Sequence, residues 1–188
     1  MAQFEIKDGV AIIPDGTTEI SYNTNINCTS LKSITIPESV KTIAGHAFEG
    51  CTSLESIVVA DGNPVYDSRE GCNAIIETAT NTLIKGCKTT VIPNSVTKIG
   101  SFAFNGCTSL RSVTIPASVT EIGSLAFDGC TSLENITIPD GVTEIGGSAF
   151  YGCTSLKSIT IPELVTEIGV HAFSGCASLL RVSQFPSV

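Results

Sequence analysis

The 188-residue chain contains no tryptophan, and only 15% of its residues are charged. Basic residues are scarce, because ten Lys and Arg are set against eighteen Asp and Glu, which gives a net charge of −8. Nucleic acids and anionic membranes attract basic proteins, so both are poor partners for this chain. No apolar run approaches the roughly 18 residues that a membrane-spanning helix needs, which argues against membrane insertion. The first residues, Met-Ala-Gln-Phe-Glu, lack the basic and then apolar pattern of a signal peptide.

Hydrophobic residues make up 42% of the chain, enough to give one domain of residues 1–188 a substantial core. Eight cysteines would suggest a disulfide framework if their spacing were irregular. Instead, a step of 23 residues recurs between them, as in the series Cys107, Cys130, Cys153 and Cys176. A fixed period of roughly 20–50 residues indicates a stacked array of repeats. We therefore interpret the cysteines as buried, reduced side chains that act as small hydrophobic residues.

One repeat has the pattern Cys-x-x-Leu-x-x-Ile-x-Ile-Pro-x-x-Val-x-x-Ile-Gly-x-x-Ala-Phe-x-Gly. In the unit that begins at Cys107, Val113 and Ile115 alternate like the inward face of a strand, and Pro116 ends that strand. Gly123 is interpreted as the site of a sharp bend, and Phe127 as a side chain that fills the interior after a short turn. No single unit can bury its own apolar residues, so the units are expected to stack.

Stacking places equivalent residues of successive units on top of one another, roughly 4.8 Å apart. Two ladders of large apolar side chains are expected in the core. The leucine ladder contains Leu31, Leu54, Leu110, Leu133, Leu156 and Leu179, and the phenylalanine ladder contains Phe48, Phe104, Phe127, Phe150 and Phe173.

Both ends depart from the repeat, as the capping units of a solenoid do. In the first unit Thr24-Asn25 stands in place of the Ala-Phe pair, and in the last unit the proline slips by one place, to Pro186.

A non-repetitive insert of about residues 60–92 interrupts the array, because Cys51 and Cys107 lie 56 residues apart. Its two β-prone runs around a polar turn predict a hairpin in which Glu77 pairs with Thr82. Such a symmetric hairpin would bring Cys72 and Cys87 face to face, and a disulfide between them is one possibility in an oxidising compartment.

The repeated unit resembles the BspA-like leucine-rich repeats, also called the Treponema pallidum type, over nearly the whole chain. The Gly-Asn-Pro-Val-Tyr run at 62–66 also resembles inserts of that family. The resemblance implies a right-handed, mainly β solenoid with short helical turns and a parallel sheet on its concave face. It further implies bacterial proteins that are secreted or held at the cell surface, some of them adhesins for host matrix proteins. It assigns no functional residues.

Catalytic, cofactor and metal sites find no support in the residue pattern. No histidine is paired with a nucleophile in a recurring arrangement, and no phosphate-binding glycine loop is present. Thiolate zinc sites use pairs of closely spaced cysteines, whereas here one cysteine occurs in each unit. We therefore expect no catalytic residue, no cofactor and no bound metal.

One row of like charges stands out among the outward positions. Glu121, Glu144 and Glu167 share one phase of the repeat, two residues after its valine, and could attract a basic partner. The alternative interpretation is a solvated acidic edge that keeps the array soluble. A different outward row alternates in sign and should neutralise itself: Lys32, Glu55, Arg111, Glu134 and Lys157.

The leading hypothesis is a non-catalytic protein-interaction or adhesion module, possibly for a host extracellular-matrix protein. Because function tends to concentrate in irregular, exposed segments, the insert is expected to be exposed and to contribute to the partner site. Its candidate residues are Tyr66, Asp67, Arg69 and Glu70. The alternatives are a carbohydrate-binding module, which would need stacking aromatics on one face, or a structural spacer within a larger surface protein.

Overall fold

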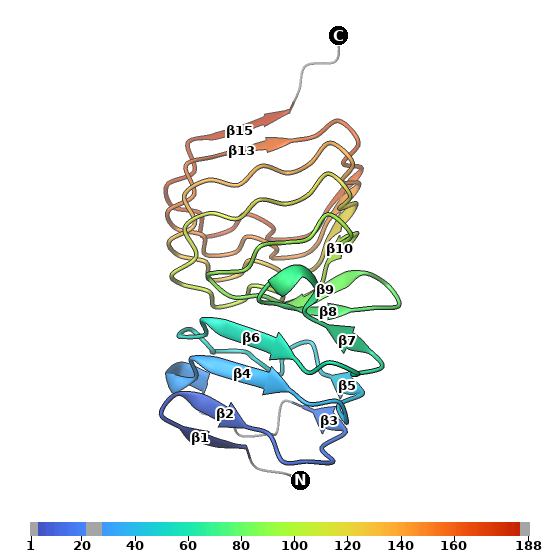
Figure 1. Cartoon of the computed structure of the whole chain (residues 1–188). Helices are drawn as coiled ribbons and strands as arrows, with labels where there is room; N and C mark the ends of the chain where they lie inside the picture. The colour runs from blue at the N-terminus through green and yellow to red at the C-terminus, as the bar shows by residue number, and fades with distance from the viewer. Residues whose placement is uncertain (1–3, 22–27, 185–188) are drawn as a thin grey trace.

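The computed structural model describes residues 4–21 and 28–184 as a column of stacked coils (Figure 1). The fold is a mainly β solenoid of about seven turns with parallel sheets, so the predicted repeat solenoid is confirmed. The predicted departures at Thr24-Asn25 and at Pro186 lie outside the described residues. Within those residues, no helix is both long enough and apolar enough to cross a bilayer.

The predicted Leu-x-x-Ile-x-Ile strands line one side of the column, here called the first side. Ser33–Ile36 lies opposite Ser56–Val59 in parallel, residue by residue. In the middle of the column the parallel pairing between neighbouring coils on this side is reduced to two isolated bridges, from Asn135 to Ser112 and from Asn135 to Ser158. The strands of the first side are β1 (Glu5–Lys7), β2 (Val10–Ile12), β4 (Ser33–Ile36), β6 (Ser56–Val59), β13 (Ser158–Ile161) and β15 (Arg181–Gln184).

A second set of parallel strands lines another side of the column, here called the second side. These strands were not predicted from the sequence, because a strand of two residues is too short to show the alternation of apolar and polar side chains. Isoleucines of these strands, such as Ile99, Ile122 and Ile145, point into the core and are fully buried. The strands are β3 (Glu19–Ile20), β5 (Thr42–Ile43), β10 (Lys98–Ile99), β11 (Glu121–Ile122), β12 (Glu144–Ile145) and β14 (Glu167–Ile168).

A glycine follows Ile99, Ile122, Ile145 and Ile168, and it allows the coils to approach closely. A Cβ atom on Gly123 would lie 2.6 Å from the Ser101 amide nitrogen and 2.8 Å from the Gly100 carbonyl carbon. The φ angle of Gly123 is not in the left-handed region, so glycine is needed here for the close approach of the neighbouring coil and not for an unusual backbone conformation. That freedom is used six residues later, where Gly129 adopts a φ of +69° in the turn that ends the unit.

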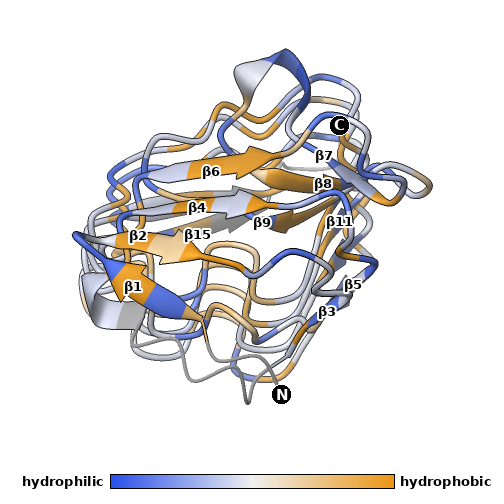
Figure 2. Cartoon of the chain, turned by 60° about the horizontal axis from the view of Figure 1, so that its bottom comes forward, coloured by the Kyte–Doolittle hydropathy of each residue, from blue (hydrophilic) through white to orange (hydrophobic). Residues whose placement is uncertain are grey.

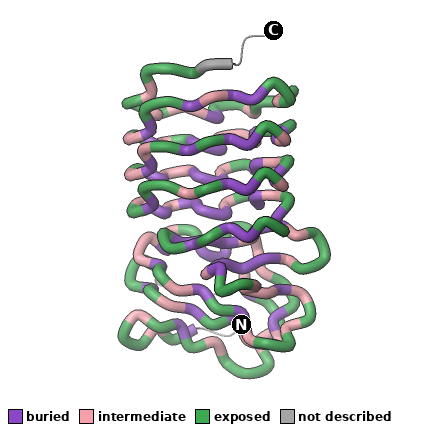
Figure 3. The backbone as a smooth tube through the Cα atoms, turned by 45° about the horizontal axis from the view of Figure 1, so that its top comes forward, coloured by how far each residue is buried: buried purple, intermediate pink, exposed green. Residues whose placement is uncertain are grey.

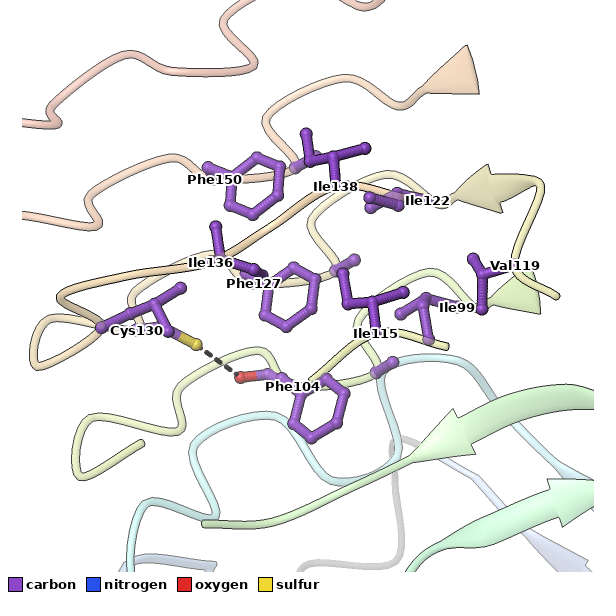
Figure 4. Close-up of a cluster of buried hydrophobic side chains, with 14 of the residues drawn as sticks. Ile99, Phe104, Ile115, Val119, Ile122, Phe127, Cys130, Ile136, Ile138 and Phe150 are labelled. Carbon is purple, nitrogen blue, oxygen red and sulfur yellow. Dashed lines mark hydrogen bonds between the residues drawn. The ribbon is translucent and has the colours of Figure 1, made fainter. Parts of the chain in front are cut away.

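The phenylalanine ladder forms the centre of the core (Figure 4). The rings of Phe104, Phe127 and Phe150 are fully buried and nearly parallel. The ring centroids of Phe104 and Phe127 lie 5.1 Å apart, and those of Phe127 and Phe150 lie 5.2 Å apart. The predicted packing of each ring on its equivalent is therefore confirmed for this part of the column.

The insert contributes β7 (Tyr66–Asp67), β8 (Ile75–Glu77) and β9 (Thr82–Lys85), and short 3-10 helices span Arg69–Gly71 within it and Cys28–Ser30 before it. The three strands pair antiparallel in this order, and β9 then pairs in parallel with β10. Glu77 lies opposite Thr82 as predicted, but the register shifts between Ile75 and Ile76.

The irregular register keeps Cys72 and Cys87 apart. The two thiols are free, and they belong to different core clusters, so the disulfide considered for them does not form. The Cys72 thiol donates to the Ala74 carbonyl, and the Cys87 thiol donates to the Asn73 carbonyl.

The insert is a buried joint between two core clusters, so the prediction that this segment is exposed is wrong for most of it. Ile75 packs into the cluster that begins at the N-terminus, and Ile76 packs into the cluster that continues towards the C-terminus. Both side chains are fully buried, because successive residues of a strand face opposite ways and β8 lies between the two clusters.

The insert supplies hydrogen-bond donors that a preceding regular coil would otherwise provide, and one of these donors is the Lys85 side chain. In regular coils the amides of one turn donate to carbonyls of the next, for example Phe127 to Ala149 and Gly129 to Tyr151. Before the coil that contains Phe104, the Gly86 amide donates to the Ala103 carbonyl, and the buried Lys85 ammonium donates to the Asn105 carbonyl at 3.1 Å.

Candidate acidic groove on the second side

The three candidate glutamates lie side by side on the outer face of the second side. Glu121 pairs with Glu144, and Glu144 pairs with Glu167, in adjacent parallel strands. Equivalent residues on such strands lie about 4.8 Å apart. Glu144 and Glu167 are exposed, and Glu121 is partly exposed. The structure thus brings together the three glutamates that the sequence selected.

The same register continues into the insert. Lys98 pairs with both Glu121 and Thr82, and Thr82 pairs with Glu77. The acidic row therefore consists of Glu77, Thr82, Lys98, Glu121, Glu144 and Glu167. The sequence could have placed Lys98 in this row, because Lys98 follows Val96 by two residues just as Glu121 follows Val119. Glu77 could not be found in this way, because it lies in the non-repetitive insert.

Only one ion pair is formed within this row, between Lys98 and Glu121 at 2.5 Å, among the residues that the structure describes. The charged row of the first side differs. Glu134 lies 2.8 Å from Lys157 and 3.7 Å from Arg111. Glu55 lies 2.7 Å from Lys88, which the insert supplies. The lysine partners lower the pKa of both carboxyls, mainly through their hydrogen bonds. The first side is self-neutralised as predicted, whereas the acidic row is not.

Two recesses border the acidic row. One has a volume of about 650 Å³ and is lined by Glu77, Lys98 and Glu121 together with threonines and Ile43. The other has a volume of about 230 Å³ and is lined by Glu121, Glu144, Glu167 and neighbouring glycines. Because Glu121 and Ser101 line both recesses, the two form one groove along the row, here called the acidic groove.

The four candidate residues of the insert line a separate recess of about 350 Å³. Tyr66 is buried, and its hydroxyl accepts a hydrogen bond from the Ile43 amide at 3.0 Å. Arg69 contacts Asp67 at 2.6 Å and donates to the Asn81 side chain at 2.8 Å, so these charges hold the insert together. Glu70 is exposed. The insert therefore offers Glu70 to a partner more readily than the other three residues.

The BspA-type leucine-rich repeat signature matches six copies in this chain, over residues 9–70 and 79–188. The chain belongs to the BspA-type leucine-rich repeat family. No curated protein matches the chain.

Solved bacterial structures share the BspA-type fold of this chain. The pneumococcal vaccine antigen PcpA is 27% identical, with a TM-score of 0.74 over 82% of this chain and 39% of its own. A leucine-rich repeat protein from Eubacterium ventriosum is 27% identical, with a TM-score of 0.72 over 91% of this chain and 53% of its own. A leucine-rich cell surface protein from Faecalibacterium prausnitzii is 30% identical, with a TM-score of 0.64 over 93% of this chain and 59% of its own. The chain thus spans less than two thirds of each.

The cysteine of the BspA-type repeat links successive coils. The Cys130 thiol donates to the Phe104 carbonyl of the preceding coil at 3.2 Å (Figure 4). The Cys153 thiol donates in the same way to the Phe127 carbonyl at 3.1 Å. Both thiols are free and buried, as predicted. Cys51 is disulfide-bonded, so the prediction of a reduced side chain is wrong there.

The buried thiols should make stability fall at high pH. Burial raises the pKa of Cys153 from 9.0 to about 12. The unfolded chain therefore releases this proton near pH 9, while the folded chain keeps it until about pH 12, so the free energy of unfolding declines across this window. Urea unfolding at about pH 8 and about pH 10.5 measures the decline. The decline should be smaller in Cys153→Ala, and an equal decline in both proteins would contradict this assignment.

No group of three or more His, Cys, Asp or Glu side chains within residues 4–21 and 28–184 has an arrangement that could hold a metal ion.

Proposed function

We propose that this chain is a non-catalytic protein-interaction module whose acidic groove binds an extended basic segment of a partner protein. The observation that carries the proposal is the in-register stacking of Glu121, Glu144 and Glu167 on adjacent strands. Like charges that lie directly opposite one another on neighbouring strands destabilise a sheet, so the stacking of these three carboxylates does not itself stabilise the fold. A partner that brings Lys or Arg side chains to the groove would remove this repulsion.

The shape of the groove supports the same kind of partner. It runs across successive strands from Glu77 to Glu167, so it suits a segment that is extended rather than compact. The charged row of the first side is a weaker candidate, because Glu55 and Glu134 both have lysine partners. In the acidic row Glu121 is paired with Lys98, and no ion pair is formed by Glu144 or Glu167 among the residues that the structure describes.

The setting that we propose is the surface of a bacterial cell or the medium around it. The F. prausnitzii relative is described as a cell surface protein, and the pneumococcal relative as a vaccine antigen. An adhesion module that binds host extracellular-matrix proteins fits this setting.

The proposal is tested by pull-down from serum and extracellular-matrix proteins. The test variant carries Glu121→Gln, Glu144→Gln and Glu167→Gln. A matched control carries Glu5→Gln, Glu49→Gln and Glu163→Gln, which remove the same charge at exposed positions outside the row.

We expect the test variant to lose roughly tenfold or more of the captured partner and the control to retain it, with capture weakening as salt is raised. Equal capture by both variants would rule out the acidic groove. Loss of capture in Glu70→Gln alone would place the partner at the insert instead.

A further inference from the structure

The larger recess of the acidic groove, here called the wide recess, lies where the insert interrupts the second side of the column. Figure 2 shows β3, β5 and β11 on a different side of the column from β2, β4 and β6. In the described chain β5 is hydrogen-bonded to β3 but to no strand of the insert, whereas β9 of the insert joins the sheet that continues through β10. The Ile43 amide of β5 donates to the Tyr66 hydroxyl and not to a neighbouring strand. The ladder of strands is therefore broken beside Ile43.

This break leaves two isoleucines incompletely buried in the interior of the array. Buried residues recur at the same places in successive coils of the C-terminal half (Figure 3). Ile20, Ile99 and Ile122 occupy the same position of the repeat as Ile43 and are fully buried. Ile43 and Ile84 are only partly buried, and both line the wide recess. The wide recess thus contains apolar surface that a ligand side chain would cover with a gain in free energy.

The rest of the wall of the wide recess offers methyl groups and hydrogen-bond acceptors. The Thr80 hydroxyl donates to the Glu77 carboxylate, and the Thr97 hydroxyl donates to the Thr80 carbonyl at 3.1 Å. The Lys98 ammonium is paired with Glu121. Because these donors are in use, the recess suits a side chain that has a large apolar surface, a donor and no acceptor. The indole ring of tryptophan has this combination.

We propose that the wide recess binds the indole ring of a tryptophan in the basic partner segment, so that the acidic groove recognises an aromatic anchor together with Lys or Arg residues. This inference rests on the proposed function, because Glu144 and Glu167 hold the basic residues. The volume of about 650 Å³ lies within the range of ligand pockets. The row from Glu77 to Glu167 covers five strand spacings, about 24 Å, which about seven extended residues span.

The test compares two extended peptides of lysine and alanine that differ at a single position near one end, which is tryptophan in one peptide and alanine in the other. Calorimetric titration measures both dissociation constants, and the methyl NMR signals of Ile43 and Ile84 report contact with the ring. We expect the tryptophan peptide to bind roughly tenfold more tightly and to shift both methyl signals. The alanine peptide should leave these methyl signals nearly unchanged.

A variant that fills the wide recess separates the anchor from the charges. Thr97→Phe places a ring at the wall of the recess, so the advantage of tryptophan should disappear while the alanine peptide keeps its affinity. The matched control is Thr143→Phe, because Thr143 is an exposed equivalent of Thr97 that lines neither recess of the groove. This control should keep the tenfold difference between the peptides. Circular dichroism checks that both variants fold.

Equal affinities of the two peptides for the wild-type chain would overturn the inference, as would an unchanged advantage of tryptophan in Thr97→Phe. Failure of the proposed function gives a different result. In that case the alanine peptide would bind equally to the wild-type chain and to the variant with Glu121→Gln, Glu144→Gln and Glu167→Gln.

Discussion

Replacing Phe127 with alanine is expected to lower the free energy of unfolding by about 3–5 kcal/mol. The ring is fully buried between Phe104 and Phe150, at centroid distances of 5.1 and 5.2 Å. Its removal leaves a cavity between two coils that are held apart by their own backbone pairing, so the neighbouring rings cannot collapse into the space. Urea unfolding followed by circular dichroism measures the loss.

A matched control is Tyr151→Ala, which removes an aromatic ring that is 49% exposed in the same turn of the next coil. This change should alter the free energy of unfolding by no more than about 0.5 kcal/mol. Equal effects of the two substitutions would show that the phenylalanine ladder does not dominate the core.

Adding one methyl group at Gly123 is expected to destabilise the column by about 3 kcal/mol, near the upper end of the range for overpacking. The new Cβ would lie 2.6 Å from the Ser101 nitrogen and 2.8 Å from the Gly100 carbonyl carbon, and both atoms belong to the backbone of the adjacent coil. Neither atom can rotate away, so the two coils must separate and their backbone hydrogen bonds must lengthen. The thermal midpoint of Gly123→Ala reports this effect.

Gly147→Ala provides the control for that experiment. A Cβ on Gly147 would meet its nearest atom, the Val170 carbonyl oxygen, at 3.5 Å, which is an ordinary contact. This variant should unfold within a few degrees of the wild type. A Gly123→Ala protein as stable as Gly147→Ala would refute the account of close coil packing.

The repeat made much of the fold predictable. The period of 23 residues fixed which side chains stack, and the ring distances of Phe104, Phe127 and Phe150 confirm the ladder. The alternating charges of the first side were also readable, because residues of equal phase meet on adjacent strands, as Glu134 and Lys157 do.

The insert was the least predictable part of the fold. Its hairpin pairing at Glu77 and Thr82 follows from the polar turn, but the bulge between Ile75 and Ile76 has no signature in the sequence. Loss of periodicity suggested an exposed segment, whereas much of the insert is buried because it must fill the gap between two cores. The buried Lys85 was unforeseen for the same reason, since its role depends on the carbonyls of a neighbouring coil.

The candidate site also contains residues that could be predicted from the sequence and residues that could not. Glu121, Glu144 and Glu167 could be selected because they repeat in phase. Their extension to Glu77 required the register of β8 and β9 on β10, which only the three-dimensional structure supplies. The environment of Tyr66 is likewise a three-dimensional feature, because this residue of β7 is buried and its hydroxyl accepts a hydrogen bond from the Ile43 amide of β5.

The most direct measurement of the central claim is an NMR titration of the labelled chain with an extended oligolysine peptide. We expect amide shift changes along the acidic row, from Glu77 and Lys98 through Glu121 and Glu144 to Glu167, and their loss when the three stacked glutamates are changed to glutamine. Shift changes confined to the first side, or equal changes over all acidic surfaces, would contradict the acidic groove as the partner-binding surface.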